Sequence, residues 1–239
     1  MILENKRLAV CAELIAQDGF AGIDGKKRAA DVGTDHGYLA AFLAAEGICE
    51  SVTACDINEK PLSLAERTVR ENGLSGKVKT VLSDGLDNVD GSGITHIICA
   101  GMGGELIADI ISRCEWAERT HLVLQPMTKA DELRKYLYEN GWRVLAEKAR
   151  RDGDFVYAIM LAEHTFEPID YPCDERYLAA GRITALDGGD AADYLLMRSG
   201  RLKKAAAGML QSSSEETKAR GKQLSELAEA LGKEAEEKP

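Results

Sequence analysis

The sequence predicts an α/β protein with a mostly parallel sheet that ends in an antiparallel hairpin, followed by a small all-α region. Three observations support this prediction. Short apolar runs alternate with amphipathic helical segments from residue 28 to residue 141, which is typical of β-α-β units. Two consecutive strand-like runs then occupy residues 142–164, and after Pro168 and Pro172 the pattern becomes helical throughout.

The α/β elements follow one another in a regular order. An opening helix presents one apolar face, made by Leu8, Cys11, Ala12, Ile15 and Ala16. A glycine-rich loop spans 18–27. Strands are expected at 28–33, 51–57, 77–84, 94–100 and 121–126, with helices at 37–47, 59–71, 104–114 and 129–141. Because residues 94–100 are continuously apolar, we expect that strand to be covered on both faces. The turn Asp152-Gly153-Asp154 indicates a hairpin.

The C-terminal part is expected to form a separate helical unit. Residues 174–211 have a helical pattern with a break at Gly188-Gly189. Apolar stripes run along this segment and the last helix, at Leu195, Leu202, Met209, Leu224, Leu227 and Leu231. This spacing predicts a helical hairpin or antiparallel coiled coil. We therefore expect two domains, 1–166 and 167–239.

Composition restricts the class of protein. The chain has 239 residues, 45% of them hydrophobic, and lacks an apolar run long enough to span a membrane. The charged residues near its start argue against a signal peptide, so we expect a cytoplasmic protein. We also expect a monomer or weak dimer. Six cysteines form no C-x-x-C pair, so we expect buried free thiols and no metal.

A loop rich in glycine follows the first strand. Its residues are Asp31, Gly33, Thr34, Asp35, His36, Gly37 and Tyr38. The spacing is similar to the D-x-G-x-G-x-G loop of class I methyltransferases, whose sheet also ends in an antiparallel hairpin; Asp35 replaces the middle glycine. Gly33 permits a sharp strand-to-helix turn, and Gly37 lets the helix begin close to a ligand. Such a loop alone is a weak signal.

Two further acidic positions strengthen this interpretation. Asp56 ends the second strand, where a carboxylate can accept both ribose hydroxyls of an adenosine cofactor. Asp84-Gly85 follows the third strand, where methyltransferases contact the adenine amino group. Each element alone is more simply explained as a turn or a helix cap. Their occurrence in the correct order favours an adenosine-containing cofactor.

The charge of the loop favours S-adenosylmethionine over a dinucleotide. A pyrophosphate binds at bare backbone amides, and Asp31 and Asp35 would repel it. The methionine end of S-adenosylmethionine carries an ammonium and a sulfonium and has no phosphate. The sequence therefore predicts methyl transfer rather than hydride transfer.

The segment after the fourth strand bears on the methyl acceptor. Residues 100–104 read Ala-Gly-Met-Gly-Gly, without the D/N-P-P-Y/F motif of enzymes that methylate exocyclic amino groups. A ring nitrogen such as adenine N1 has a free lone pair and needs no deprotonation, so positioning can supply most of the catalysis. An unpaired base could stack beside His36, Tyr38 or Met102, although Tyr38 and Met102 could equally be core residues.

Several longer matches point to one family. They are residues 6–8 (K-R-L), 31–39 (D-x-G-T-D-H-G-Y-L), 97–104 (I-x-C-A-G-M-G-G), 122–126 (L-V-L-Q-P) and 133–137 (L-R-K-Y-L). On these stretches the sequence resembles the bacterial tRNA (adenine-22-N1) methyltransferase family over residues 4–163, and in the helical tail only in character. The resemblance implies S-adenosylmethionine as donor, N1 of a D-arm adenosine of tRNA as acceptor, and a tRNA-binding C-terminal extension.

The resemblance and the loops together assign the site. The expected cofactor-binding residues are Asp31, Gly33, Thr34, Asp35, His36, Gly37, Tyr38, Asp56, Ile57, Asp84, Gly85, Gly101 and Met102. The expected catalytic residues are Asp35, His36, Met102, Gln125 and Pro126, the last two lining the target base.

RNA binding must come from local basic patches, because the net charge is −10. The candidates are Lys6, Arg7, Lys26, Lys27, Arg28, Arg198, Arg201, Lys203 and Lys204, although a solvated surface explains such charges equally well. Two alternatives stay open. A small-molecule methyltransferase would use the C-terminal helices as a lid or for dimerisation, and a non-catalytic RNA-binding module would have lost Asp56 or the Asp31 loop.

Overall fold

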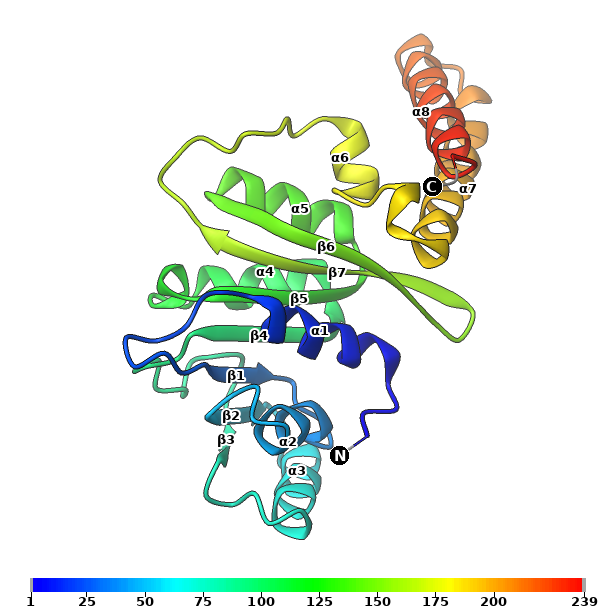
Figure 1. The fold of residues 1–239 in the computed structure, drawn as a ribbon. Coiled ribbons are helices and arrows are strands. Elements are labelled where there is room, and N and C mark those ends of the chain that lie inside the picture. The colour runs from blue at the N-terminus through cyan, green and yellow to red at the C-terminus, as the bar shows by residue number, and fades with distance from the viewer. Residues whose placement is uncertain (1, 238–239) are drawn as a thin grey trace.

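The computed structural model describes residues 2–237 and contains one seven-stranded sheet in the order β3-β2-β1-β4-β5-β7-β6 (Figure 1). Its strands are β1 (Arg28–Val32), β2 (Ser51–Asp56), β3 (Val78–Leu82), β4 (His96–Gly103), β5 (His121–Thr128), β6 (Trp142–Asp152) and β7 (Phe155–His164). The first five strands are parallel, whereas β7 runs antiparallel to both β5 and β6. The predicted fold class, including the terminal hairpin, is confirmed.

Helices cover both faces of the sheet (Figure 1). One face packs against α1 (Lys6–Gln17), α2 (Tyr38–Ala45) and α3 (Glu59–Glu71), and the other against α4 (Gly104–Ser112) and α5 (Ala130–Glu139). Successive residues of a strand point to opposite faces, so Ile97 joins the α4 side of the core and Ile98 the α1 side. Both are fully buried, as the unbroken apolar run predicts.

Strand β4 is longer than the sequence predicts. It continues from Ala100 to Gly103 and pairs with β5, with register shifts on either side of Met102. The backbone at Gly101 has a φ of +85°, a conformation that suits glycine. Two glycines in this stretch indicate a loop locally, but pairing with β5 extends the strand.

The C-terminal part is helical, as predicted. It contains α6 (Glu175–Ala180), α7 (Gly189–Leu210) and α8 (Glu215–Glu234), and short 3₁₀ turns occur at Ala117–Arg119 (η1) and Ala185–Asp187 (η2). Helices α7 and α8 lie side by side as a hairpin (Figure 1). A Cβ at Gly221 would lie only 3.1 Å from Met209 Cβ, so a glycine there allows the two helices to approach closely.

A buried ion pair joins the helical part to the sheet. Arg134 of α5 is fully buried and donates to Glu147 Oε1 of β6 at 2.6 Å and to the Tyr194 hydroxyl of α7 at 2.8 Å. It also donates to the Leu178 carbonyl oxygen of α6 at 2.9 Å. Burial disfavours the charge of Arg134, but Glu147 and Tyr194 together outweigh this and raise the pKa of the guanidinium. The C-terminal helices are therefore held firmly against the sheet.

Within the described part of the chain, every helix is too short or too polar to cross a membrane.

Candidate cofactor and substrate site

A large cavity opens at the carboxyl edge of the parallel strands. Its volume is about 1000 Å³, and three segments line it: residues 2–8 before and within α1, residues 31–39 between β1 and α2, and residues 100–101 of β4. Ligands of open α/β sheets bind at this edge, where the strand order reverses between neighbouring strands. Here β1 lies between β2 and β4, so the cavity occupies that position.

The backbone of the β1–α2 loop is unusual at three positions. Gly33, Asp35 and Gly37 have φ values of +68°, +53° and +70°. Aspartate tolerates this left-handed conformation better than most residues, which explains how Asp35 can replace the middle glycine. A Cβ at Gly37 would lie 2.9 Å from Ala65 Cβ, so a side chain at this position would push α2 away from α3.

Asp31 is a buried carboxylate beside the cavity. It is 4% exposed and accepts a hydrogen bond from Thr34 Oγ1 at 2.7 Å. Burial raises the pKa of Asp31 to about 6, although the Thr34 hydrogen bond opposes the shift. A cationic ligand group in the cavity would stabilise the ionised form.

Asp56 lies at the end of β2 next to the same loop. Its Oδ1 accepts from the Asn58 amide at 2.9 Å, and its Oδ2 lies 3.4 Å from the Asp35 amide nitrogen. The amides of Gly33 and Thr34 both donate to the carbonyl oxygen of residue 55, at 2.8 and 3.0 Å. These bonds hold the loop against β2. Ile57 follows with 60% of its surface exposed, which leaves an apolar side chain beside the carboxylate.

The Asp84-Gly85 turn packs against α4, on the face of the sheet opposite to α1, α2 and α3. Gly85 has a φ of +56°, and a Cβ there would lie 3.0 Å from Ile110 of α4. Asp84 forms an ion pair with Arg113 at 3.1 Å, and Arg113 also contacts Asp87 at 2.6 Å. Arg113 is a partner that the sequence analysis missed, because it lies 29 residues from Asp84.

Gln125 has a different role from the one expected. We expected it to line the target base, but it is fully buried and does not line the cavity. Its Oε1 accepts from the Gly101 amide at 3.1 Å and from Arg7 Nη1 at 2.5 Å. Gln125 therefore supports the cavity wall from behind, because β5 places its side chain between β4 and α1.

Arg7 belongs to the cavity rather than to an open basic surface. Its Nε donates to Asp152 Oδ2 at 2.8 Å, and its guanidinium lies over the Tyr157 ring, 5.1 Å from the centroid. The K-R-L match and the positive charge marked this position in the sequence. In the structure, Arg7 connects α1 to the β6–β7 hairpin through Asp152 and, through Gln125, to Gly101.

The remaining catalytic candidates, except Pro126, lie at or beside the cavity. Met102 is directly apposed to Gly33, since a Cβ there would overlap the Met102 methyl group at 2.2 Å. His36 and Tyr38 stack in parallel with ring centroids 5.4 Å apart, and Tyr38 is 51% exposed, so it is not a core residue. Pro126 instead lines a second hollow of about 280 Å³, beside Tyr157.

Three of the expected RNA-binding residues are placed unfavourably. Lys26, Lys27 and Arg28 lie at the start of β1, at the sheet edge opposite the cavity. Lys26 pairs with Glu50 and Arg28 with Asp24, while Lys27 Nζ donates at 2.5 Å to the carbonyl oxygens of Ile15 and Asp18 at the end of α1. These charges already have partners within the fold, and a role of these three residues in RNA binding stays a prediction.

The basic residues of α7 divide into two kinds. Arg198 is 9% exposed, and its Nη2 lies 3.4 Å from Asp131 Oδ2 of α5. Its side chain therefore packs between α7 and α5 and is largely inaccessible to RNA. Arg201, Lys203 and Lys204 are exposed, and Arg201 borders the second hollow. Lys6 is likewise exposed at the start of α1.

Comparison with known proteins agrees with this geometry. The model of a family described as methyltransferase domain matches residues 5–160, and the chain belongs to that family. The predicted resemblance is confirmed by the Bacillus subtilis tRNA (adenine(22)-N(1))-methyltransferase, 29% identical over 161 residues. That alignment covers 66% of this chain and 64% of the relative, so the chain matches somewhat less than two thirds of the relative's length.

Solved structures share the fold across nearly the whole chain. A Streptococcus agalactiae protein of the NADB-Rossmann superfamily has a TM-score of 0.80 at 26% identity, covering 97% of this chain and 98% of that one. The B. subtilis m1A22 tRNA methyltransferase has a TM-score of 0.79 at 23% identity, covering 97% and 100%. An M. capricolum relative solved with S-adenosyl-homocysteine has a TM-score of 0.77 at 22% identity, covering 97% and 98%. The similarity therefore includes the C-terminal helices.

Proposed function

We propose that this protein transfers a methyl group from S-adenosylmethionine to N1 of adenosine 22, in the D-arm region of tRNA. One observation carries the proposal. In a methyltransferase domain, the buried Asp31 carboxylate, whose pKa is raised by burial, lines a large cavity at the carboxyl ends of the parallel strands. The relative aligned to this domain is named for that reaction.

The residues around the cavity fit S-adenosylmethionine. Asp31 would accept the ammonium of its methionine part, which relieves the cost of burying a carboxylate. Asp56 would accept the ribose hydroxyls, and exposed Ile57 would cover one face of the adenine. Asp84 and Gly85 would border the adenine amino group. When bound, the cofactor supplies an electrophilic methyl group on a sulfonium.

The protein's part in the reaction is mainly positioning. Adenine N1 attacks with its own lone pair, so the site needs no general base. The parallel rings of His36 and Tyr38 provide a stacking surface for an unpaired adenine. Asp35, exposed at the rim of the cavity, would stabilise the positive charge that develops on the base. Gly101, fixed by Gln125, and Met102 would limit where the acceptor nitrogen can lie.

The proposed tRNA path leads from the cavity to α7. The second hollow lies between β5, the β6–β7 hairpin and α7, and it combines aromatic Phe155 and Tyr157 with Arg201. Together with Lys203 and Lys204, this surface offers stacking and phosphate contacts. We propose a monomer or weak dimer that acts on tRNA in the cytoplasm.

Methyl transfer to unmodified tRNA transcripts tests the proposal. The protein is incubated with labelled S-adenosylmethionine, and the digested RNA is analysed by nucleoside mass spectrometry. We expect 1-methyladenosine, and we expect it to disappear from a transcript whose adenosine 22 is replaced by guanosine. If the protein binds the cofactor but labels no tRNA, the site instead serves a small-molecule acceptor.

A further inference from the structure

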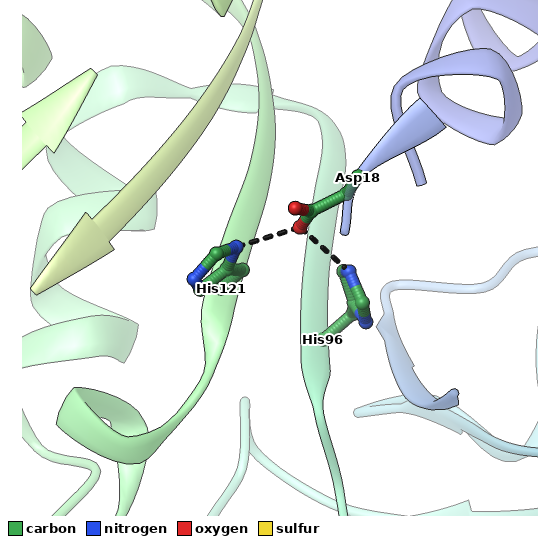
Figure 2. A group of neighbouring side chains, drawn as sticks. All are labelled: Asp18, His96 and His121. Carbon is green, nitrogen blue, oxygen red and sulfur yellow. Dashed lines mark hydrogen bonds and ion pairs between the residues drawn. The ribbon is translucent and has the colours of Figure 1, made fainter. Parts of the chain in front are cut away.

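A second cluster of polar side chains lies at the opposite edge of the sheet from the cofactor cavity. Figure 2 shows Asp18, which follows α1, between His96 and His121, the first residues of β4 and β5. Asp18 Oδ2 lies 3.0 Å from His96 Nε2 and 2.6 Å from His121 Nδ1. All three side chains are nearly buried, at 7%, 0% and 11% exposure. The proposed reaction uses none of them.

The orientation of the Thr95 hydroxyl is coupled to which nitrogen of His96 carries a proton. Thr95 Oγ1 donates its single proton to the Arg28 carbonyl oxygen at 2.9 Å and accepts from the Arg28 amide at 2.9 Å. It also lies 2.8 Å from His96 Nδ1. While the hydroxyl proton points at the Arg28 carbonyl, His96 Nδ1 is the donor to Thr95, and Nε2 of the neutral ring is an unprotonated acceptor. If the hydroxyl turns to Nδ1, the ring proton lies on Nε2 and is donated to Asp18.

In the first of these two states, one acceptor faces another. With Nε2 unprotonated, its lone pair and the Asp18 Oδ2 carboxylate oxygen are 3.0 Å apart, and both side chains are nearly buried. A cation between them would turn this repulsion into two favourable contacts.

The surroundings resemble the outer shell of a metal site. Ligating histidines usually bond through their second nitrogen to a carboxylate, carbonyl or similar group. His96 uses Nδ1 in this way with Thr95 at 2.8 Å, and the Nε2 of His121 lies 3.7 Å from the Glu163 carboxylate. The Phe20 ring stacks on His121 with a centroid distance of 4.1 Å and shields it from solvent.

We propose that Asp18, His96 and His121 bind one zinc ion through Oδ2, Nε2 and Nδ1. The three ligand atoms lie within 4.8 Å of one another, so small side-chain rotations bring each to the roughly 2.0–2.2 Å that zinc requires. Two imidazoles and one carboxylate suit zinc better than magnesium or calcium, and solvent would supply the fourth ligand. Cysteine spacing led us to expect no metal, but this site contains no thiolate.

The ion would fasten α1 to the sheet. Asp18 follows the last turn of α1, and the first turn of the same helix carries Arg7 into the cavity wall. Metal binding at one edge would therefore stabilise the helix that shapes the other edge. This role does not depend on which acceptor is methylated.

Zinc binding to the full chain tests the proposal directly. Protein stripped with a chelator is titrated with zinc chloride by calorimetry, and its melting temperature is followed in parallel. We expect one equivalent of zinc and a rise in melting temperature. His121→Gln should reduce zinc affinity at least tenfold, whereas His164→Gln, which changes another largely buried histidine outside the cluster, should not.

X-ray absorption at the zinc edge of the wild-type protein keeps the test independent of whether the variants fold. A shell of nitrogen and oxygen atoms that includes two imidazoles supports the proposal. Absence of stoichiometric binding, or sulfur in the shell, overturns it, since sulfur would place the ion on cysteines elsewhere. Methyl transfer is not the readout, so this result and the proposed function can fail separately.

Discussion

Substitution of Asp31 by asparagine tests whether the cofactor loop contains an unfavourably buried charge. Burial raises the pKa of Asp31 from 3.8 to about 6 in the folded protein. Between these values the folded state binds more protons at this site than the unfolded state, so its contribution to stability falls as the pH rises. The destabilisation is absent below about pH 4 and complete above about pH 6. A shift of about two units corresponds to roughly 3 kcal/mol.

The variant removes this titration, so the informative quantity is the difference between the two proteins. The free energy of unfolding of Asp31→Asn, minus that of the wild type, should increase by up to about 3 kcal/mol between pH 4 and pH 6.5. The substitution also lowers the free energy of unfolding of the variant by about 1 kcal/mol at every pH, because hydrogen bonding to Thr34 and the Ala40 amide is weakened. Urea unfolding of the cofactor-free proteins at several pH values measures this difference.

Cofactor binding should depend on pH in the opposite sense. The wild-type affinity for S-adenosylmethionine should rise through the same pH interval, because the ionised carboxylate is the form that pairs with an ammonium. The variant should bind weakly and with little pH dependence, as measured by calorimetry. A stability difference that does not depend on pH would show that burial does not destabilise the ionised Asp31. Equal cofactor affinity of the two proteins would show that Asp31 is not a cofactor ligand.

Three further changes test other parts of the structure. Asp56→Ala should weaken S-adenosylmethionine binding by roughly 1–3 kcal/mol in calorimetry, because two ribose hydroxyls lose their acceptor; an unchanged affinity would remove Asp56 from the site. Arg134→Met should lower the free energy of unfolding by about 3–5 kcal/mol, since it leaves Glu147 charged and buried, and adding Glu147→Leu should recover much of this loss; equal stabilities of the single and double variants would contradict the argument. Arg201→Glu with Lys204→Glu should reduce tRNA affinity and its salt dependence in filter binding without changing cofactor affinity; normal turnover on tRNA would show that α7 does not contact the RNA.

Much of the site was predictable because its signals are local. Glycines and aspartates at strand ends specify the β1–α2 loop, and the observed positive φ values at Gly33, Asp35 and Gly37 agree with the residue types. Other assignments required knowledge of distant neighbours. Gln125 has the same polar side chain whether it faces a ligand or supports Gly101, and only the packing of α1 against β5 distinguishes the two.

The sequence by itself determined the parallel sheet, the antiparallel hairpin, the helical tail and the acidic cofactor loop. These depend on hydrophobic periodicity and turn chemistry, which act over a few neighbouring residues. Tertiary structure alone decided that Lys27 caps α1, that Arg7 reaches the cavity, and that Asp18 meets two histidines 78 and 103 residues away. Such contacts arise when strands and helices from different parts of the chain pack together, and no residue spacing along the sequence encodes them.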